Sequence, residues 1–497
     1  MKLIVKDMDI SSDGPLIAVL NNKDAAKMDL HSRDRIKIIK NGKIETTLLN
    51  ISETEKAIKH GHIGLYEEVL DSLKIKQGDI IKIVPARKPE SLDYIKKKLD
   101  GYKLDKKEID QIVWDIVHNK LSLSELTYFV AACYSTELDD KETTLLTKAM
   151  AAHGDILKIN KYPIMDKHCV GGVAGNRTTM LIVPILAAVG VTMPKTSSRS
   201  ITSPAGTADT MEVLTDVSIH IKKMKKIVEK AYGCIVWGGA LNLAPADDKI
   251  IKVERPLSID AKSQLLASVM AKKMSVSATH VLVDIPTGKG AKLPTMKKAL
   301  QLKKDFESLA KSVGMKIKVI ITDGKEPIGN GIGPALEARD VLWILNQDKR
   351  GPEDLKKKSL TMAGIMLEMA GKASKGKGYK KAKEILESGK AYEKMVQIIT
   401  LQGKKVIDPK KIKIGKIRYD FKAKKSGVIK EISNMTISKI ARVAGAPEDE
   451  GTGIYLYKHI GDKVKKGEVL YTIYCHNKGK LEYAKYAIKN LNGFVIK

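Results

Sequence analysis

Two neighbouring segments combine cations, glycines and hydroxyl groups in the way that phosphate binding requires. The first segment, residues 166–179, reads DKHCVGGVAGNRTT, and the second, residues 195–209, reads KTSSRSITSPAGTAD. Glycines let backbone N–H groups approach an anion, a following helix directs its positive end to the same place, and lysine adds a point charge. The glycine spacing matches neither the P-loop nor the dinucleotide-binding fingerprint, so we expect phosphate binding without an ATPase or Rossmann motif.

These segments need a layered scaffold, and the pattern of elements around them predicts one. Strands are expected at residues 234–237, 280–285 and 316–322, alternating with helices, which indicates an α/β sheet. Between residues 91 and 153 the apolar spacing is helical, and the helices around residues 258–274 are expected to return to this helical subdomain. A small-ligand site is expected in the cleft between the two parts.

The two ends of the chain predict additional domains. Residues 26–38 and 71–83 repeat one another, with apolar positions that correspond at Leu30 and Ile75 and at Ile38 and Ile83. This repeat predicts two halves that close a small barrel, and it resembles double-psi barrel domains. The strand-rich end resembles half of a biotinyl or lipoyl barrel without the lysine hairpin of a carrier, so we expect a structural role.

The predicted fold class is therefore α/β, with a helical subdomain, a central mixed α/β sheet domain, an N-terminal small β-barrel domain and a C-terminal α+β barrel-like domain. The expected boundaries are 1–86 for the N-terminal barrel, 87–157 joined by about 243–277 for the helical subdomain, 158–242 with 278–416 for the α/β domain, and 417–497 for the C-terminal domain.

The second phosphate segment also carries a family resemblance. Residues 197–213, SSRSITSPAGTADTMEV, resemble the signature of the thymidine and pyrimidine-nucleoside phosphorylases, and Lys167-His168 and Gly171-Gly172 precede it at matching spacing. The resemblance covers roughly residues 88–497 and includes DIPTGKG at 284–290 and GPALE at 333–337. It implies a fold like that of the class II nucleoside phosphorylases, and the additional residues 1–86 resemble the archaeal AMP phosphorylase branch of the family.

The resemblance implies phosphorolysis of AMP to adenine and ribose 1,5-bisphosphate, with CMP and UMP as further substrates. It places the reaction in nucleotide degradation that feeds ribose 1,5-bisphosphate isomerase and RuBisCO. Such a reaction needs a positioned phosphate and a proton for the leaving base, so positioning and electrostatics supply most of the acceleration. Inorganic phosphate is then a co-substrate, no metal or cofactor is expected, and a homodimer or larger homo-oligomer is expected.

The resemblance also assigns roles to individual residues. Asp260 corresponds to the proton donor, which requires a raised pKa, although its type alone favours an N-cap of the following helix. Ser268 and Lys272 share a helix face and match base-pocket positions. Lys292 corresponds to the residue that binds the 5′-phosphate of the nucleotide. The alternative is that Lys292 is an ordinary solvated lysine of a turn. The other substrate-binding residues are Lys167, Gly171, Gly172, Thr178, Ser197, Ser198, Arg199, Ser200, Ile201, Thr202, Ser203 and Thr207.

Two positions depart from the family pattern. Cys169 stands where the family has serine, and because a thiol is a weak donor, its contact with phosphate is in doubt. Val253 replaces the arginine that reads the pyrimidine ring, which favours a nucleotide over a pyrimidine nucleoside. The alternatives that stay open are a thymidine or pyrimidine-nucleoside phosphorylase and a phosphoribosyltransferase of the anthranilate type.

Composition favours an enzyme over a nucleic-acid-binding protein. The formal charge of +30 comes mostly from lysines spread along 497 residues, and aromatics are only 5%, so stacking platforms for bases are scarce. A basic nucleic-acid-binding protein is the alternative from a different functional class. Four scattered cysteines predict reduced thiols, and no segment reads as a signal peptide or a membrane span, so we expect a cytoplasmic protein without nucleic-acid or membrane partners.

Overall fold

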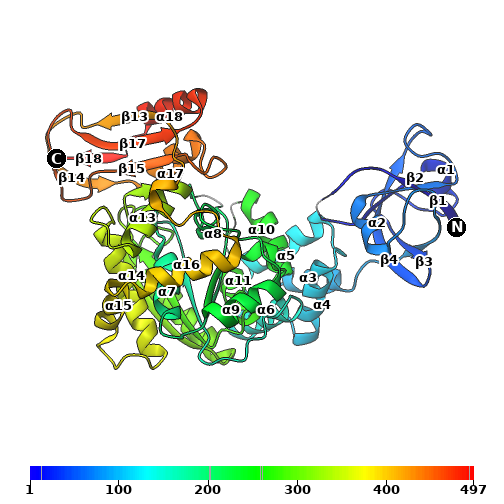
Figure 1. Ribbon diagram of the computed structural model, residues 1–497. Coiled ribbons are helices and arrows are strands. Elements are labelled where there is room, and N and C mark those ends of the chain that lie inside the picture. The colour runs from blue at the N-terminus through cyan, green and yellow to red at the C-terminus, as the bar shows by residue number, and fades with distance from the viewer. Residues whose placement is uncertain (13, 201–202, 258, 260, 492) are drawn as a thin grey trace. The chain divides into compact units, whose positions relative to one another are not determined.

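The computed structural model describes residues 1–497 except residues 13, 201, 202, 258, 260 and 492 (Figure 1). The described residues form two compact units, of which one comprises residues 1–154 with 244–271 and the other residues 155–243 with 272–497. Among the described helices, none is long and apolar enough to cross a membrane.

The first unit begins with a closed six-stranded barrel, which confirms the predicted N-terminal barrel. Its strands are β1 (Lys2–Asp7), β2 (Ile17–Asn21), β3 (Arg35–Lys40), β4 (Lys43–Ser52), β5 (His62–Leu65) and β6 (Ile80–Ala86), in the order β1-β5-β2-β4-β3-β6. Short helices α1 (Asn22–Ala26) and α2 (Glu67–Leu73) accompany them. The repeated positions Ile38 and Ile83 are fully buried and face each other across β3 and β6. The sequence repeat therefore supplies matching halves of the barrel core.

The helical part of the first unit follows the predicted pattern. It consists of α3 (Ser91–Leu99), α4 (Lys106–Val117), α5 (Leu123–Ser135) and α6 (Asp140–Ala152), and the returning helix α10 (Pro245–Leu257) contacts α4, α5 and α6. Three of these helices begin with a capping box, at Asp105, Ser122 and Asp139. Each cap satisfies N–H groups that a helix start leaves unpaired, so the local sequence fixes where these helices begin.

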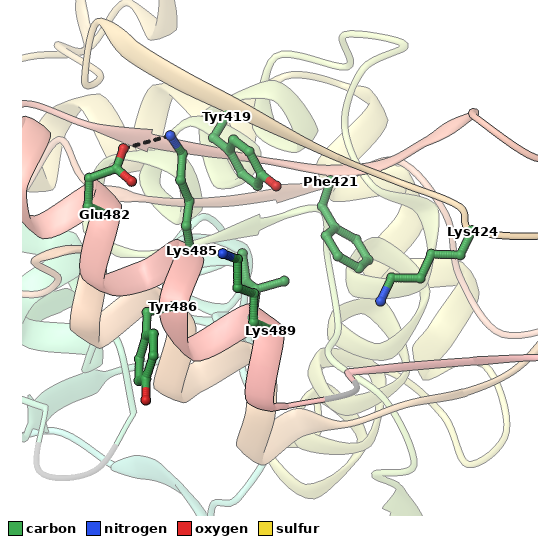
Figure 2. Close-up of a pocket in the computed structure, with 8 residues that line it drawn as sticks. Tyr419, Phe421, Lys424, Glu482, Lys485, Tyr486 and Lys489 are labelled. Atoms are coloured by element: carbon green, nitrogen blue, oxygen red, sulfur yellow. Dashed lines mark hydrogen bonds and ion pairs between the residues drawn. The ribbon is translucent and has the colours of Figure 1, made fainter.

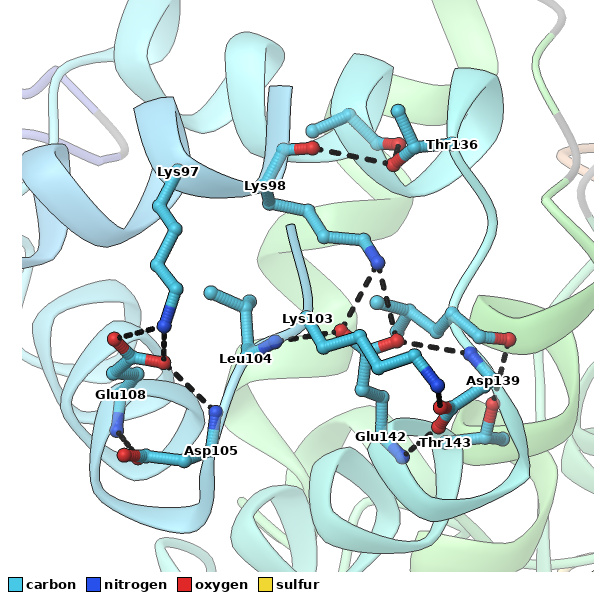
Figure 3. A network of polar contacts seen from close by, with 12 residues as sticks. Lys97, Lys98, Lys103, Leu104, Asp105, Glu108, Thr136, Asp139, Glu142 and Thr143 are labelled. Atoms are coloured by element: carbon cyan, nitrogen blue, oxygen red, sulfur yellow. Dashed lines mark hydrogen bonds and ion pairs between the residues drawn. The ribbon is translucent and has the colours of Figure 1, made fainter. Parts of the chain in front are cut away.

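A buried ion pair joins the helices of this part (Figure 3). The ammonium group of Lys98 lies 3.0 and 3.1 Å from the carboxylate oxygens of Glu142, which also accepts a hydrogen bond from the Leu104 N–H at 2.9 Å. Lys249 of α10 donates to the carbonyl oxygens of Ile116 and Val117 at the end of α4, at 2.8 and 2.6 Å. These contacts satisfy buried charges and the last carbonyls of α4, so they attach the returning segment to the bundle.

The second unit contains two parallel sheets. Strands β11 (Lys316–Asp323), β10 (His280–Thr287) and β7 (Met165–Cys169) form one, β8 (Met193–Ser197) and β9 (Gly233–Trp237) form the other, and a parallel bridge links Ile164 to Thr192. The three predicted strands are therefore present. The helices of this unit are α7 (Thr178–Ala187), α8 (Thr207–Glu212), α9 (Ile221–Ala231), α12 (Met296–Ser312), α13 (Pro334–Leu345), α14 (Glu353–Met369), α15 (Gly378–Glu387) and α16 (Lys390–Gly403). Helix α11 (Lys262–Ser275) begins in the first unit and ends in the second. All residues of α7 are buried, and the main core lies around it.

The C-terminal part is α+β. Its elements are β12 (Gly331–Ile332), β13 (Ile417–Lys422), β14 (Gly427–Ile432), β15 (Gly453–Leu456), β16 (Lys463–Val464), β17 (Val469–Cys475), β18 (Phe494–Ile496), α17 (Asn434–Ala444) and α18 (Lys478–Asn490). They form a four-stranded sheet, β12-β15-β17-β13, and a three-stranded sheet, β16-β14-β18. Strand β12 comes from the chain before α13, so one of these sheets includes residues from outside 417–497. The predicted domain boundaries stay predictions.

Candidate active site

The loops that follow β7, β10 and β11 lie together at one edge of their sheet. Because the strands are parallel, their carboxyl ends share that edge, where α/β proteins bind ligands. Residues 170–177 after β7, called the phosphate loop from here on, contact the loop after β11 through the Ile328 N–H, which donates to the Ala174 carbonyl at 3.0 Å. The Gly324 N–H donates to the Thr287 carbonyl at the end of β10, also at 3.0 Å. Hydrogen bonds thus connect all three loops.

Glycine is required in the phosphate loop by conformation and by space. Gly171 and Gly172 have φ angles of +101° and +90°, a region that side chains rarely adopt. A Cβ atom on Gly172 would lie 2.3 Å from the backbone nitrogen of Lys292. The predicted 5′-phosphate loop is therefore packed directly against the predicted phosphate loop, with no room for a side chain between them.

One face of β7 directs Lys167 and Cys169 toward a buried polar cluster, because alternate residues of a strand share a face. Lys167 is 2% exposed, and its ammonium group donates to the Thr178 hydroxyl at 2.9 Å. On the neighbouring strand, Asp284 accepts from the Thr322 hydroxyl at 2.6 Å and forms an ion pair with Lys358 at 3.2 Å. Burial raises the pKa of the Asp284 carboxyl, but the charges of Lys358 and Lys167 outweigh burial and hold that pKa low.

The opposite face of β7 carries Asp166 and His168. Asp166 is fully buried between two ammonium groups, at 2.6 Å from Lys273 and 3.3 Å from Lys195. Burial lowers the pKa of Lys195 to about 7, despite the charge of Asp166. Burial and the neighbouring Lys273 and Lys195 also hold the pKa of His168 well below its ordinary value. His168 is consequently neutral at physiological pH and can accept or donate a hydrogen bond there.

These buried groups leave a positive excess beside the phosphate loop. On each face of β7 two lysines accompany one carboxylate, so each cluster has one lysine more than it has carboxylates, and isolated charges are costly in a protein interior. Burial lowers the pKa of Lys195 and of Lys167, and a bound anion would favour their protonated forms. The set comprises Lys167, Lys195, Lys273 and Lys358 with Asp166 and Asp284.

Arg177 connects the phosphate loop to the second predicted segment. Its Nε donates to the buried carboxylate of Glu337, and its Nη1 and Nη2 donate to the Thr207 hydroxyl at 3.1 Å and the Ala205 carbonyl at 2.5 Å. The Glu337 carboxylate also accepts from the Thr210 hydroxyl at 3.1 Å. A fully paired arginine of this kind fixes the two segments relative to each other.

Comparisons with known proteins agree with this organisation. The glycosyl transferase family helical bundle domain matches residues 92–154, the glycosyl transferase family a/b domain residues 161–392, and the pyrimidine nucleoside phosphorylase C-terminal domain residues 428–494. The AMP phosphorylase of Thermococcus kodakarensis is 48% identical over 485 residues, which are 97% of this chain and 95% of that protein. This chain belongs to the AMP phosphorylase family.

Other AMP phosphorylases are similar over equally long stretches. The enzyme of Pyrococcus furiosus is 48% identical over 97% of this chain and 95% of its own length, and that of Methanococcoides burtonii 43% identical over 100% and 97%. Among solved structures, the anthranilate phosphoribosyltransferase of Thermus thermophilus superposes with a TM-score of 0.52 at 19% identity, covering 62% of this chain and 99% of that one. This likeness shows the fold, and it confirms the predicted combination of helical and α/β parts.

Three of the predicted binding residues lie at the ends of elements of the second unit. Thr178 is the first residue of α7 and lies against Lys167, whereas Ser197 ends β8 with a buried hydroxyl that has no hydrogen-bond partner among the described residues. Thr207 begins α8 and contacts Arg177. The hydroxyl of Thr178 therefore lies beside Lys167 of β7, and that of Thr207 lies beside Arg177 of the phosphate loop.

Other predicted binding residues make contacts within the loop after β8 or with α8. Arg199 pairs with Glu212 and, at 3.3 Å, with Asp209. The hydroxyl of Ser200 donates to the Ser203 carbonyl, and that of Ser203 donates to the Ala205 carbonyl at 2.9 Å. Ser198 is exposed at the end of β8. Ile201, Thr202 and the predicted proton donor Asp260 lie outside the described residues, so their roles stay predictions.

The base-pocket and 5′-phosphate predictions fall on defined elements. Ser268 and Lys272 are half-buried residues of α11, and Lys292 is exposed in the loop that packs against Gly172. Val253, where pyrimidine phosphorylases have arginine, is buried in α10.

Cys169 is held as a thiol. Its sulfur accepts a hydrogen bond from the Asn176 amide at 3.2 Å, and burial with the nearby Asp284 raises the pKa of the thiol. A raised pKa disfavours the reactive thiolate, so this thiol is poorly suited to act as a nucleophile.

Sequence reasoning missed the partners that hold the motif in place. Asp284, Lys358, Lys273 and Glu337 were not predicted as site residues, although each is a charged side chain with little or no exposure. The available signal was a charged residue inside an apolar run, as in HVLVDIP of β10. A buried charge needs a partner, so such a residue indicates a polar cluster even where no motif does.

A groove of about 430 Å³ lies in the C-terminal part, between β13 and α18 (Figure 2). Its walls combine aromatic rings with lysines, and Lys485 pairs with Glu482 at 2.7 Å. The lining residues are Tyr419, Phe421, Lys424, Glu482, Lys485, Tyr486, Ile488 and Lys489. None of them belongs to the loops after β7, β8, β10 or β11, so the groove is separate from the candidate active site.

Proposed function

We propose that this chain catalyses the phosphorolysis of nucleoside 5′-monophosphates, converting AMP and phosphate to adenine and ribose 1,5-bisphosphate, with CMP and UMP as further substrates. The observation that carries the proposal is the excess of buried lysines beside a glycine turn in a member of the AMP phosphorylase family. Such a site holds a dianion and excludes water from it.

In the proposed mechanism, a phosphate oxygen forms a bond to C1′ of the ribose while the bond from C1′ to the base nitrogen breaks. Lys167, Thr178 and Ser197 hold the phosphate together with the N–H groups of the Gly171–Gly172 turn. The electron pair of the broken bond stays with the base, which takes a proton from Asp260. Fixed cations that face the incoming dianion need no reorganisation as charge moves, which lowers the barrier.

Residues of α11 and of the loop after β10 are proposed to bind the nucleotide. Ser268 and Lys272 contact the base, and Lys292 contacts the 5′-phosphate. Support comes from the position of Lys292 directly beside the phosphate loop, where its backbone approaches Gly172. We further propose that the reaction requires no metal or other cofactor, so dialysis against a chelator leaves turnover unchanged.

The decisive experiment measures phosphate-dependent base release from AMP, CMP, UMP, adenosine, uridine and thymidine under identical conditions. We expect AMP to be turned over with stoichiometric formation of ribose 1,5-bisphosphate. Faster turnover of uridine or thymidine than of AMP would assign the chain to pyrimidine-nucleoside phosphorolysis instead. Salt-sensitive binding of polynucleotides without any turnover of mononucleotides would support the nucleic-acid-binding alternative.

A homo-oligomer in the cytoplasm is proposed from the family resemblance. The barrel of residues 1–86 is proposed as a module for assembly or for covering the substrate. Its attachment to the helical part supports a fixed arrangement, because Arg35 of the barrel lies 2.5 Å from Glu125 and Lys120 pairs with Glu45.

A further inference from the structure

A side chain of the C-terminal part reaches the phosphate loop. Asn434, the first residue of α17, is 1% exposed. Its Oδ1 accepts a hydrogen bond from the Ala174 N–H at 3.1 Å, and its Nδ2 donates to the Gly324 carbonyl at 3.0 Å. One amide therefore connects the phosphate loop after β7 to the loop after β11.

The phosphate loop is held from a second direction at the same residue. The Ala174 carbonyl accepts from the Ile328 N–H at 3.0 Å, so both backbone groups of Ala174 are paired. Its methyl group is buried in the apolar core of the C-terminal part, in a cluster that includes Ile332 and Ile437. Gly175 lies so close to Ile328 that a Cβ atom on Gly175 would be 2.1 Å from the Ile328 carbonyl oxygen. The second half of the loop consequently has little room to move.

The loop after β10 packs against the same asparagine. A Cβ atom on Gly290 would lie 3.4 Å from the Cβ of Asn434, an ordinary van der Waals distance, so this loop lies beside the asparagine. Gly324 makes two hydrogen bonds here. Its N–H donates to the Thr287 carbonyl at the end of β10, and its carbonyl accepts from Asn434, so Gly324 connects Asn434 to that strand. Asn434 is thus hydrogen-bonded to two of the three loops at this edge of the sheet and lies beside the third.

We propose that Asn434 is a positioning residue for inorganic phosphate, acting through the conformation of the phosphate loop. This inference rests on the proposed function. A carboxamide is the side chain that offers a donor and an acceptor on one small rigid group, and both are used here. Loss of the amide leaves the Ala174 N–H and the Gly324 carbonyl buried without partners, which favours a different loop conformation. The N–H groups of the Gly171–Gly172 turn then no longer converge on the anion.

The test compares Asn434→Ala and the nearly isosteric Asn434→Asp with the wild-type enzyme in steady-state phosphorolysis of AMP. Both variants are expected to raise KM for phosphate about ten- to a hundredfold and to change KM for AMP less than about twofold, because displacement of a binding group by about 1 Å has effects of that size. In Asn434→Asp an acceptor faces the Gly324 carbonyl, so this variant removes the donor while preserving the volume of the side chain.

Ser433→Ala is the matched control. Ser433 caps the same helix by accepting the Thr436 N–H at 3.2 Å, and this cap lies within α17. The control should lower Tm as the Asn434 variants do and leave KM for phosphate unchanged. Parallel increases of both KM values in the Asn434 variants, or the same effect in Ser433→Ala, would show that Asn434 only stabilises the C-terminal part.

Calorimetric titration with inorganic phosphate alone separates this inference from the proposed function. If the wild type binds phosphate but does not phosphorolyse AMP, the proposed function fails, and the positioning role is still judged from the Kd for phosphate. An increase of about tenfold or more in the Kd for phosphate of the folded Asn434→Asp variant supports the role. An unchanged Kd in Asn434→Asp overturns it.

Discussion

Lys273 of α11 lies 2.6 Å from a carboxylate oxygen of Asp166 on β7, although the two residues are 107 positions apart in the sequence. The contact fixes the end of the helix that carries the adjacent Lys272 to the strand that carries Lys167 and His168. Lys195 shares the same carboxylate, so two ammonium groups compete for one counterion in a buried place. Burial outweighs the attraction of Asp166 and lowers the pKa of Lys195 to about 7.

Stability should therefore depend on pH through Lys195. Burial lowers its pKa from 10.5 to about 7 in the folded protein, so between about pH 7 and 10.5 the unfolded chain binds the extra proton. The free energy of unfolding contributed by this group must then rise with pH, by at most about 1.4 kcal/mol per pH unit. Urea denaturation of wild type and Lys195→Met from pH 6 to 10 measures the effect. The free energy of unfolding of the wild type, relative to that of Lys195→Met, should increase as pH rises.

The exposed pair of Lys383 and Glu387, 3.7 Å apart, provides the control for this measurement. Surface pairs contribute at most about 1 kcal/mol, so Lys383→Met should follow the wild-type pH profile. Identical profiles for wild type and Lys195→Met would contradict a shifted lysine in the cluster.

Asp260→Asn tests the proposed proton donor. An amide cannot supply the proton that the leaving base requires, so kcat should fall at least about a hundredfold while AMP and phosphate still bind. Turnover and equilibrium binding of AMP are measured on the same preparation, and Tm serves as the measure of folding. Turnover near the wild-type rate with a lowered Tm would instead assign Asp260 to helix capping.

Lys292→Ala tests recognition of the 5′-phosphate. A charge-assisted contact to phosphate contributes roughly 1.5–3 kcal/mol, so kcat/KM for AMP should fall about ten- to a hundredfold and that for adenosine should change little. The control is Lys289→Ala in the same loop, because Lys289 is exposed and pairs with Glu431 at 2.8 Å. Equal losses for AMP and adenosine would show that Lys292 does not read the 5′-phosphate.

Deletion of residues 1–86 tests the role of the barrel. The remaining chain should stay folded because its helices and sheets have their own buried cores. We expect fewer subunits per oligomer by light scattering, reduced turnover of AMP, or both. The double variant Arg35→Ala with Lys120→Ala removes both ion pairs to the helical part while keeping the barrel, and it should show a weaker form of the same change. An unchanged number of subunits together with unchanged turnover after deletion would exclude the proposed role.

The sequence was most informative where local rules determine structure. The repeat with Ile38 and Ile83 predicted a barrel, and helical spacing after residue 91 predicted the bundle, because periodic apolar residues reveal which face is buried. The glycine turn at Gly171 and Gly172 was predicted for the same kind of reason, since only glycine suits the required backbone conformation.

The supporting contacts could not be predicted because they join distant residues. Asp284 and Lys358 are 74 positions apart, and nothing in either local sequence indicates the other. Asn434 lies 260 residues from Ala174, on a helix whose start is explained locally by the Ser433 cap. Only the folded chain shows which carboxylate balances which lysine. Position 260, where the sequence made its most specific chemical prediction, lies outside the described residues.

Strand β12 makes the C-terminal part inseparable from the chain before α13. Gly331 and Ile332 pair with Tyr455 and Ile454 of β15, so a break at residue 416 would leave β15 with an open edge and remove one strand from a four-stranded sheet. Exposed strand edges promote aggregation. A chimera that exchanges the C-terminal part between relatives should therefore also exchange residues 324–333. The unit that can be exchanged is defined by the shared sheet and is not one continuous segment of the sequence.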